Sequence, residues 1–278
     1  MIKISKYNSL AIATDLDGTL LSSKNEVSAE NLAAMRRLNS AGIKIILLTG
    51  RTFYEIPEIL RKCGSIDYMI YSNGAAATDG KATVFGNCIL HEKAVYLFEL
   101  FEKYETFIEI YADGVPYVSK DKFNDEAFNL HRIDKGFIPE MHISRRPVPD
   151  LSKIVTDPSR KFEMFDVFFK NESERLECTE LLKNDGEIEV TSSMTSNLEI
   201  FASGSGKGKA LERLCGIVGI PINRVVITGD SKNDISAFQT SAKKYAVSNA
   251  CPELKMLADK IICSNDENIM SYLEKEIL

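Results

Sequence analysis

Short apolar runs, each followed within two residues by a polar residue, occur in two blocks near the two ends of this chain. Between the first two runs, apolar residues recur at helical spacing and stop at Gly42. This alternation predicts βαβ units and a parallel sheet, whose carboxyl edge would gather the polar residues. The runs and their polar residues are Leu10–Thr14 with Asp15, Ile43–Leu48 with Thr49, Tyr68–Tyr71 with Asn73, and Val225–Thr228 with Asp230.

The segment between the two blocks has a different pattern. One clear helix, predicted at Glu92–Tyr104, is mixed with alternating runs, and Asp113-Gly114 is a hairpin signal. Arg145–Arg160 holds three prolines and little periodicity, so we predict a loop there. The sequence therefore predicts an α/β protein. Residues 1–84 and 190–278 form a Rossmann-like parallel-sheet core, and an α+β domain is inserted at residues 85–189.

Charge and hydropathy argue against several classes of partner. The net charge is −6, so the chain has no basic excess to neutralise a nucleic-acid backbone. No apolar run reaches the length of a signal peptide core or a membrane-spanning helix. The six cysteines form no C-x-x-C pair. We therefore expect a cytoplasmic protein with reduced cysteines and with no nucleic-acid or membrane partner.

Asp15 and Asp17 belong to the first chemistry-bearing motif, Asp15-Leu-Asp-Gly-Thr-Leu20. A carboxylate directly after a buried strand is poorly solvated and is a candidate nucleophile or metal ligand. Gly18 lets the chain turn, so the second carboxylate can reach the same volume. Two carboxylates this close repel each other unless a cation lies between them, and a hard ion such as Mg²⁺ prefers oxygen ligands. Taken alone, the motif is explained equally well by an ordinary Asp-Gly turn.

Further candidates follow later strands. Asp230 and Asp234 add carboxylates after the fourth run, although Asp234 would also suit a helix N-cap. Lys207 lies in a glycine-rich approach to a helix, but Gly208 after it breaks the Walker pattern. A solvated lysine in a flexible loop is the alternative for this residue. Thr49 at a strand end carries little information by itself.

Together and in this order, these motifs resemble the haloacid dehalogenase-like (HAD) superfamily, and within it the Cof-type phosphatases with a C2-type cap. The resemblance covers both outer segments almost end to end and is looser in the middle block, which has the length and position of the cap. It implies the HAD fold with an inserted α+β C2-type cap. The matching stretches are Asp15–Leu20, Thr49–Arg51, Ser72–Ala75, Lys207–Leu211, Gly229–Asp234, Ser248–Ala250 and Pro252–Lys255.

The resemblance also implies a mechanism. Asp15 would attack phosphorus to form an aspartyl-phosphate, and Asp17 would protonate the leaving oxygen and then deprotonate the attacking water. Thr49 and Lys207 would hold the phosphoryl oxygens. Asp15, the backbone carbonyl of Asp17, and Asp230 would bind Mg²⁺. Asp234 would orient Lys207 or a metal-bound water. Contact with the phosphate or substrate would come from Gly50, Arg51, Asn73 and Asn233.

These roles imply an Mg²⁺-dependent phosphatase, a phosphoric monoester hydrolase of small phosphorylated metabolites such as sugar phosphates, acting as a monomer or homodimer. Two alternatives stay open. One is a sugar phosphomutase or specialised sugar-phosphate phosphatase of the same superfamily, and the other is a phosphoacceptor signalling domain. In the middle block, His131 and His142 are outside candidates for substrate contact. Arg145-Arg146 could bind substrate anions, although we favour a solvated loop there.

Overall fold

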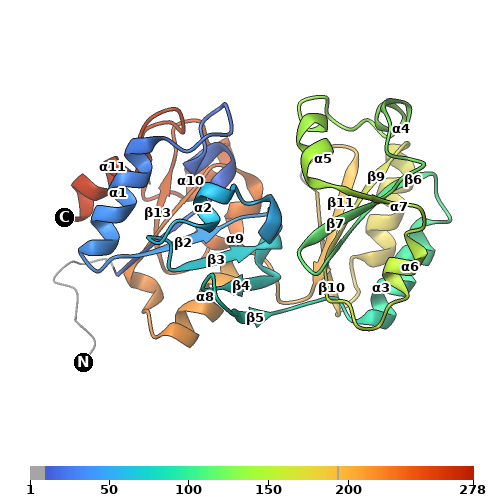
Figure 1. Ribbon diagram of the computed structural model, residues 1–278, viewed down its shortest axis with the longest axis horizontal. Coiled ribbons are helices and arrows are strands. Elements are labelled where there is room, and N and C mark those ends of the chain that lie inside the picture. Colours follow the sequence, from blue (N-terminus) through green and yellow to red (C-terminus); the bar gives the residue numbers. More distant parts are fainter. Residues whose placement is uncertain (1–9, 193) are drawn as a thin grey trace. The chain divides into compact units, whose positions relative to one another are not determined.

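The computed structural model describes residues 10–192 and 194–278 and divides the chain into two compact units (Figure 1). Unit 1 contains the described part of Met1–Arg51 together with Ile56–Gly86 and Gly206–Leu278. Unit 2 contains Asn87–Ser205 and also the short segment Thr52–Glu55. Both ends of the chain therefore contribute to unit 1.

Unit 1 is built on an eight-stranded sheet with the order β14-β13-β12-β1-β2-β3-β4-β5. The six strands from β14 to β3 run parallel, whereas β4 and β5 add an antiparallel edge. The predicted α/β fold with a parallel-sheet core is thus confirmed. The strands are β1 (Ala11–Thr14), β2 (Lys44–Leu48), β3 (Tyr68–Tyr71), β4 (Ala76–Thr78), β5 (Thr83–Gly86), β12 (Val225–Gly229), β13 (Lys243–Ala246) and β14 (Lys260–Ile261).

Two helices of unit 1 have caps that the sequence provides. The Ser28 side chain accepts a hydrogen bond from the Asn31 amide at the start of α1, and Gly219 ends α8 with a left-handed conformation. Asn31 in turn accepts from the Met270 amide, which ties α11 beside α1 (Figure 1). The helices are α1 (Ala29–Ser40), α2 (Glu58–Arg61), α8 (Lys207–Val218), α9 (Ile235–Phe238), α10 (Pro252–Leu257) and α11 (Ile269–Ile277).

Unit 2 has a six-stranded sheet with the order β10-β11-β9-β6-β7-β8, antiparallel except for the β7–β8 pair. Alternate residues of its central strands fill an apolar core that includes residues of α3 and α7. The elements are α3 (His91–Phe101), β6 (Thr106–Ala112), β7 (Val115–Ser119), α4 (Asp125–Leu130), α5 (Ile138–Ser144), β8 (Arg146–Val148), α6 (Ser152–Val155), β9 (Phe162–Phe169), α7 (Glu172–Leu182), β10 (Ile188–Thr191) and β11 (Asn197–Ala202).

Two expectations for the middle of the chain need correction. The segment Arg145–Arg160 is not all loop, because β8 pairs with β7 and α6 follows it. Residues 190–205 were assigned to the core by sequence, yet β11 pairs with both β9 and β10 in the sheet of unit 2. In both cases long-range strand pairing decided the outcome, and local sequence does not report it.

Two further features concern membrane-spanning helices and the cysteines. None of the described helices combines the length and the hydropathy that crossing a lipid bilayer requires. All six cysteines carry free thiols.

Glu163 on β9 is a buried carboxyl whose titration should be visible in the stability of the protein. Its Oε1 accepts a hydrogen bond of 3.0 Å from the Gly114 amide, whereas Oε2 is buried with no hydrogen-bond partner among the described residues. Burial raises the pKa of Glu163 to about 8. The folded protein therefore retains a proton that the unfolded chain loses near its usual pKa of 4.5.

We expect this group to make the free energy of unfolding decrease as the pH rises from 4.5 to about 8. Replacing the carboxyl by an uncharged amide in E163Q removes that contribution. Between pH 5 and pH 9, wild type should therefore lose about 4 kcal/mol of folding free energy that E163Q keeps. Urea unfolding of both proteins at pH 5 and pH 9 measures the difference, and identical pH dependence would contradict the assignment.

Candidate active site

Asp15 lies directly after β1, at the carboxyl edge of the sheet of unit 1. Its amide continues the β1–β12 ladder by donating to the Thr228 carbonyl at 3.0 Å. Lys207, the first residue of α8, places its Nζ 2.7 Å from Oδ1 of Asp15 and 2.6 Å from Oδ1 of Asp234. The lysine side chain is 0% exposed. Lys207 is thus a buried cation held between two buried carboxylates, and the alternative of a solvated lysine is wrong.

Glycines bring the start of α8 this close to its neighbours. Gly206 has φ +95° and donates its amide to the Asn73 carbonyl at 2.9 Å. A Cβ on Gly208 would lie 2.2 Å from the Ser236 carbonyl oxygen, so a side chain at this position has no room. The glycine-rich segment around Lys207 therefore serves close packing.

The electrostatics of this cluster are dominated by burial. Burial raises the pKa of Asp15 well above its usual range, Lys207 opposes the rise, and the neighbouring carboxylates add to it. Burial, followed by the charge of Asp234, raises the pKa of Asp230 to about 6. Burial opposes the charge on Lys207, but Asp15 and Asp234 outweigh it and raise the lysine pKa. The site is short of positive charge.

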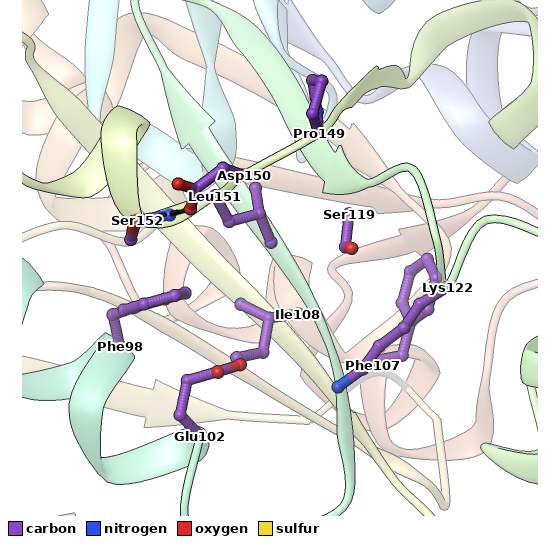
Figure 2. A pocket seen from close by; sticks show the side chains of 10 residues that line it. All are labelled: Phe98, Glu102, Phe107, Ile108, Ser119, Lys122, Pro149, Asp150, Leu151 and Ser152. Carbon is purple, nitrogen blue, oxygen red and sulfur yellow. Dashed lines mark hydrogen bonds between the residues drawn. The ribbon is translucent and has the colours of Figure 1, made fainter.

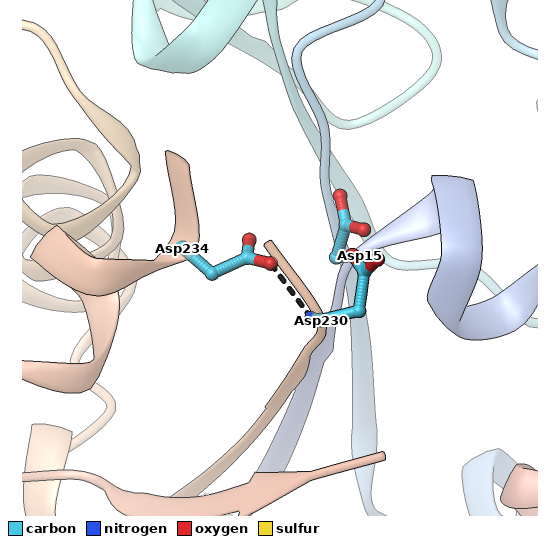
Figure 3. Close-up of side chains that lie close together, drawn as sticks. All are labelled: Asp15, Asp230 and Asp234. Carbon is cyan, nitrogen blue, oxygen red and sulfur yellow. Dashed lines mark hydrogen bonds between the residues drawn. The ribbon is translucent and has the colours of Figure 1, made fainter. Parts of the chain in front are cut away.

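Asp15, Asp230 and Asp234 form a candidate metal site (Figure 3). One carboxylate oxygen of each lies within 4.8 Å of the others. Asp234 already accepts from Lys207 through Oδ1 and from the Asp230 and Ser231 amides through Oδ2. It therefore orients its neighbours, and Asp15 and Asp230 are the better candidates for direct metal contact.

The donor set fits a small hard cation. The three carboxylates face one lysine, so a divalent ion would remove the remaining repulsion, and all donors are oxygens, as Mg²⁺ prefers. A Cβ on Gly18, which has φ +67°, would lie 2.3 Å from Oδ2 of Asp230. Only glycine lets the turn after β1 approach Asp230 this closely.

The predicted phosphate-side residues also meet in unit 1. The Thr49 hydroxyl, which is buried, accepts from the Arg51 amide at 3.0 Å, and the Thr49 carbonyl accepts from the Asn73 amide at 3.1 Å. Asn233 donates its side-chain amide to Oδ1 of Asn73 at 3.4 Å and accepts from Lys207 at 3.3 Å. Gly50 lies against the Asn73 side chain. The turns after β2, β3 and β12 thus converge beside Lys207.

Asp17 is paired with Arg51. Its carboxylate accepts two hydrogen bonds from this guanidinium, at 2.9 Å from Nε and at 2.6 Å from Nη2. The Asp17 side chain is 51% exposed, and its carboxylate does not belong to the group formed by Asp15, Asp230 and Asp234. A carboxylate that is accessible and held in a defined orientation is suited to proton transfer.

Two supporting residues were missed as individual candidates. Asn249 donates its side-chain amide to the Gly18 carbonyl at 2.7 Å, and Thr19 directs its hydroxyl toward Oδ1 of Asp230 at 3.5 Å. Both lie in stretches that carry the family resemblance. Their positions within these motif stretches were the signal that could have identified them.

The candidate substrate-contact residues of unit 2 are two histidines and an arginine pair. His131 is buried, its Nδ1 lies 2.7 Å from the Ala127 carbonyl of its own helix, and burial lowers its pKa. His142 packs edge-on against Phe123. Arg145 is buried and ion-paired with Glu55 and Glu109, so the expectation of a solvated loop is wrong for this residue, whereas Arg146 is exposed.

A cavity of about 390 Å³ lies within unit 2 (Figure 2). Its lining is divided evenly between apolar residues and polar or charged ones, and none of them is a predicted site residue. The chemistry-bearing side chains gather instead around Lys207, so we place the candidate active site there. The cavity is lined by Phe98, Glu102, Phe107, Ile108, Ser119, Lys122, Pro149, Asp150, Leu151 and Ser152.

Comparison with known proteins identifies the family. The sequence profile of the haloacid dehalogenase-like hydrolases matches residues 12–272. The chain belongs to this family. The predicted HAD resemblance and the predicted hydrolase class are therefore confirmed.

This haloacid dehalogenase-like hydrolase has curated relatives of the same length. It is 27% identical to phosphatase YwpJ of Bacillus subtilis, over 96% of this chain and 99% of the relative. It is also 27% identical to the 5-amino-6-(5-phospho-D-ribitylamino)uracil phosphatase YwtE of the same organism, over 96% and 97%.

Solved structures share the complete fold of this hydrolase. A haloacid dehalogenase-like hydrolase from B. subtilis superimposes with a TM-score of 0.82 at 24% identity, covering 97% of this chain and 100% of the other. A Thermotoga maritima protein gives 0.80 at 24% identity, covering 97% and 98%. Both units therefore belong to one architecture that recurs over the whole chain.

Proposed function

We propose that this protein is an Mg²⁺-dependent phosphatase that hydrolyses small phosphorylated metabolites, such as sugar phosphates, through an aspartyl-phosphate. The observation that carries the proposal is the buried Asp15 in contact with Lys207, beside Asp230 and Asp234. A nucleophile, a cation for the phosphoryl oxygens and hard metal ligands are thus within one small volume. The names of the relatives YwpJ and YwtE agree with this reaction class.

The first step transfers the phosphoryl group to Asp15. Lys207 contacts Oδ1 of Asp15, and we propose that Oδ2 attacks phosphorus as the bond from phosphorus to the leaving oxygen breaks. Asp17 gives its proton to that leaving oxygen. Lys207, the Thr49 hydroxyl and neighbouring amides would stabilise the charge that develops on the phosphoryl oxygens.

The second step hydrolyses the aspartyl-phosphate. Water attacks phosphorus, its proton goes to Asp17, and the bond from phosphorus to the Asp15 oxygen breaks. Asp17 has already given up its proton in the first step, so it is then the carboxylate that accepts this proton. Gly50, Asn73 and Asn233 would bound the substrate side of the pocket.

Asp15, Asp230 and the backbone carbonyl of Asp17 would hold Mg²⁺, and Asp234 would orient Lys207 or a metal-bound water. When bound, the ion supplies positive charge that screens the carboxylates and the phosphoryl group.

A family match to hydrolases over residues 12–272 argues against a phosphoacceptor signalling domain. A cytoplasmic location and a monomeric or dimeric state stay predictions of the sequence.

The proposal is tested with a panel of phosphate monoesters that includes p-nitrophenyl phosphate and several sugar phosphates. We expect release of inorganic phosphate with Mg²⁺ and a loss of at least about 100-fold with excess EDTA, restored by added Mg²⁺. Isomerisation of a sugar phosphate without release of phosphate would identify a phosphomutase. Full activity in EDTA would contradict the role of the metal.

A further inference from the structure

The segment Thr52–Glu55 crosses from one unit to the other and back. The chain leaves unit 1 after Arg51, packs with unit 2 over these four residues, and rejoins unit 1 at Ile56. It directly follows Thr49-Gly50-Arg51, the turn that we assign to the phosphate side. The peptide bond between Arg51 and Thr52 therefore links the Arg51 backbone to a segment that belongs to unit 2.

Glu55 uses both carboxylate oxygens to hold this segment. Oε2 accepts from the Thr52 amide at 2.8 Å and from the Thr52 hydroxyl at 2.9 Å. Oε1 accepts from Nη1 of Arg145. The Thr52 amide belongs to the peptide bond that joins Arg51 to Thr52, so Glu55 links Arg145 to that peptide.

Arg145 is a rigid anchor for Glu55. Its side chain is 1% exposed, and each of its nitrogens donates to a partner. Nε and Nη2 bind Glu109 at 3.0 and 2.8 Å, Nη2 also binds the Tyr111 hydroxyl at 3.0 Å, and Nη1 also binds Ser144 Oγ at 2.8 Å. Because the five N–H groups of a guanidinium lie in one plane, these bonds determine its orientation.

The Arg51 backbone is held at every polar atom around it. Its amide donates to the Thr49 hydroxyl at 3.0 Å, its carbonyl accepts from the Ser72 amide at 2.7 Å, and the next amide donates to Glu55. The Arg51 side chain donates two hydrogen bonds to Asp17. The Asp17 side chain is half exposed, and these two bonds hold its carboxylate in a defined orientation.

We propose that Glu55 and Arg145 are positioning residues that act through Arg51 to orient Asp17 for proton transfer. The proposal rests on the proposed function, in which Asp17 protonates the leaving oxygen. A displacement of about 1 Å in a positioning group can cost up to about 100-fold in rate. We therefore expect a change at Glu55 or Arg145 to lower kcat/KM more for a substrate whose leaving group needs a proton than for one whose leaving group does not.

The test compares two leaving groups in the E55Q variant. An alkyl oxygen needs a proton to leave, whereas p-nitrophenolate does not. We expect E55Q to lower kcat/KM for glycerol 2-phosphate by about tenfold and for p-nitrophenyl phosphate by less than about twofold. Equal losses for the two substrates would overturn the proposal, because a general structural defect affects both.

A double-mutant cycle identifies the residue through which Glu55 acts. If its effect passes through Asp17, E55Q should cost nothing further in kcat/KM for glycerol 2-phosphate when it is added to D17N. An additional tenfold loss in the D17N background would overturn the proposal. An inactive wild-type protein would instead refute the proposed function, so the two failures are distinguishable.

Two further variants guard against misfolding. E163Q changes another buried glutamate of unit 2 in the same way and should leave kcat/KM for both substrates within about twofold of wild type. R145K keeps the buried positive charge but loses the planar fork, so it should reproduce the leaving-group dependence of E55Q. If E55Q does not fold, the R145K result decides, and equal losses for both substrates in R145K would overturn the proposal.

Discussion

Replacing Asp15 by asparagine should abolish phosphate release, with kcat reduced by about 10⁵-fold or more. The amide keeps the shape of the side chain but is a far weaker nucleophile, so no aspartyl-phosphate forms. The measurement is phosphate release from p-nitrophenyl phosphate, together with mass spectrometry of the acid-quenched wild-type enzyme. The quenched protein should carry one phosphoryl group on the peptide that contains Asp15.

The matched control for D15N is D79N, which makes the same substitution in the exposed turn between β4 and β5. An asparagine there still accepts from the Lys81 and Ala82 amides, so activity and stability should stay at the wild-type level. Turnover of D15N at a rate close to that of D79N would exclude Asp15 as the nucleophile.

Replacing Lys207 by methionine should damage both catalysis and stability. The variant leaves Asp15 and Asp234 buried without their shared cation, which typically costs about 3–5 kcal/mol of folding free energy when one partner of a buried pair is removed. It also removes a positive charge from the phosphoryl site, for which we expect a loss of about 10³-fold in kcat. Chemical denaturation and steady-state kinetics measure the two effects separately.

Lys209 provides the control for this variant. It lies on the same helix two residues further on and is exposed, so K209M should change stability by less than about 0.5 kcal/mol. Added Mg²⁺ should restore part of the stability of K207M, because it replaces the missing positive charge beside Asp15. A K207M protein as stable and active as K209M would contradict the role of the buried lysine.

Much of the candidate site could be predicted because its residues follow strands. Asp15, Thr49, Asn73 and Asp230 each come just after a buried run, and parallel strands must align their carboxyl ends. Local signals therefore located residues that are far apart in the sequence. The roles of Lys207 and Asp234 were less determined, because a glycine-rich loop and an N-cap are common without any chemistry.

Other features could not be predicted from local sequence. Arg145 follows a polar helix end and precedes a proline-rich segment, and nothing there indicates that Glu55 and Glu109 bury it. The pairing of Arg51 with Asp17 likewise joins two separate turns. Both ion pairs depend on which elements the fold brings together, and charge in the sequence does not specify a partner.

By itself, the sequence determined the parallel-sheet core, its insertion and the set of residues at the strand ends, because burial and chain turning act over a few neighbouring residues. Only the tertiary structure decided that Lys207 is buried between two carboxylates, that β11 joins the sheet of unit 2, and that Thr52–Glu55 packs with unit 2. The contacts Lys207–Asp234, Glu55–Arg145 and Lys207–Asp15 join residues that are 27, 90 and 192 positions apart in the chain. The free energy of such contacts arises only when the elements have packed, so no local pattern carries it.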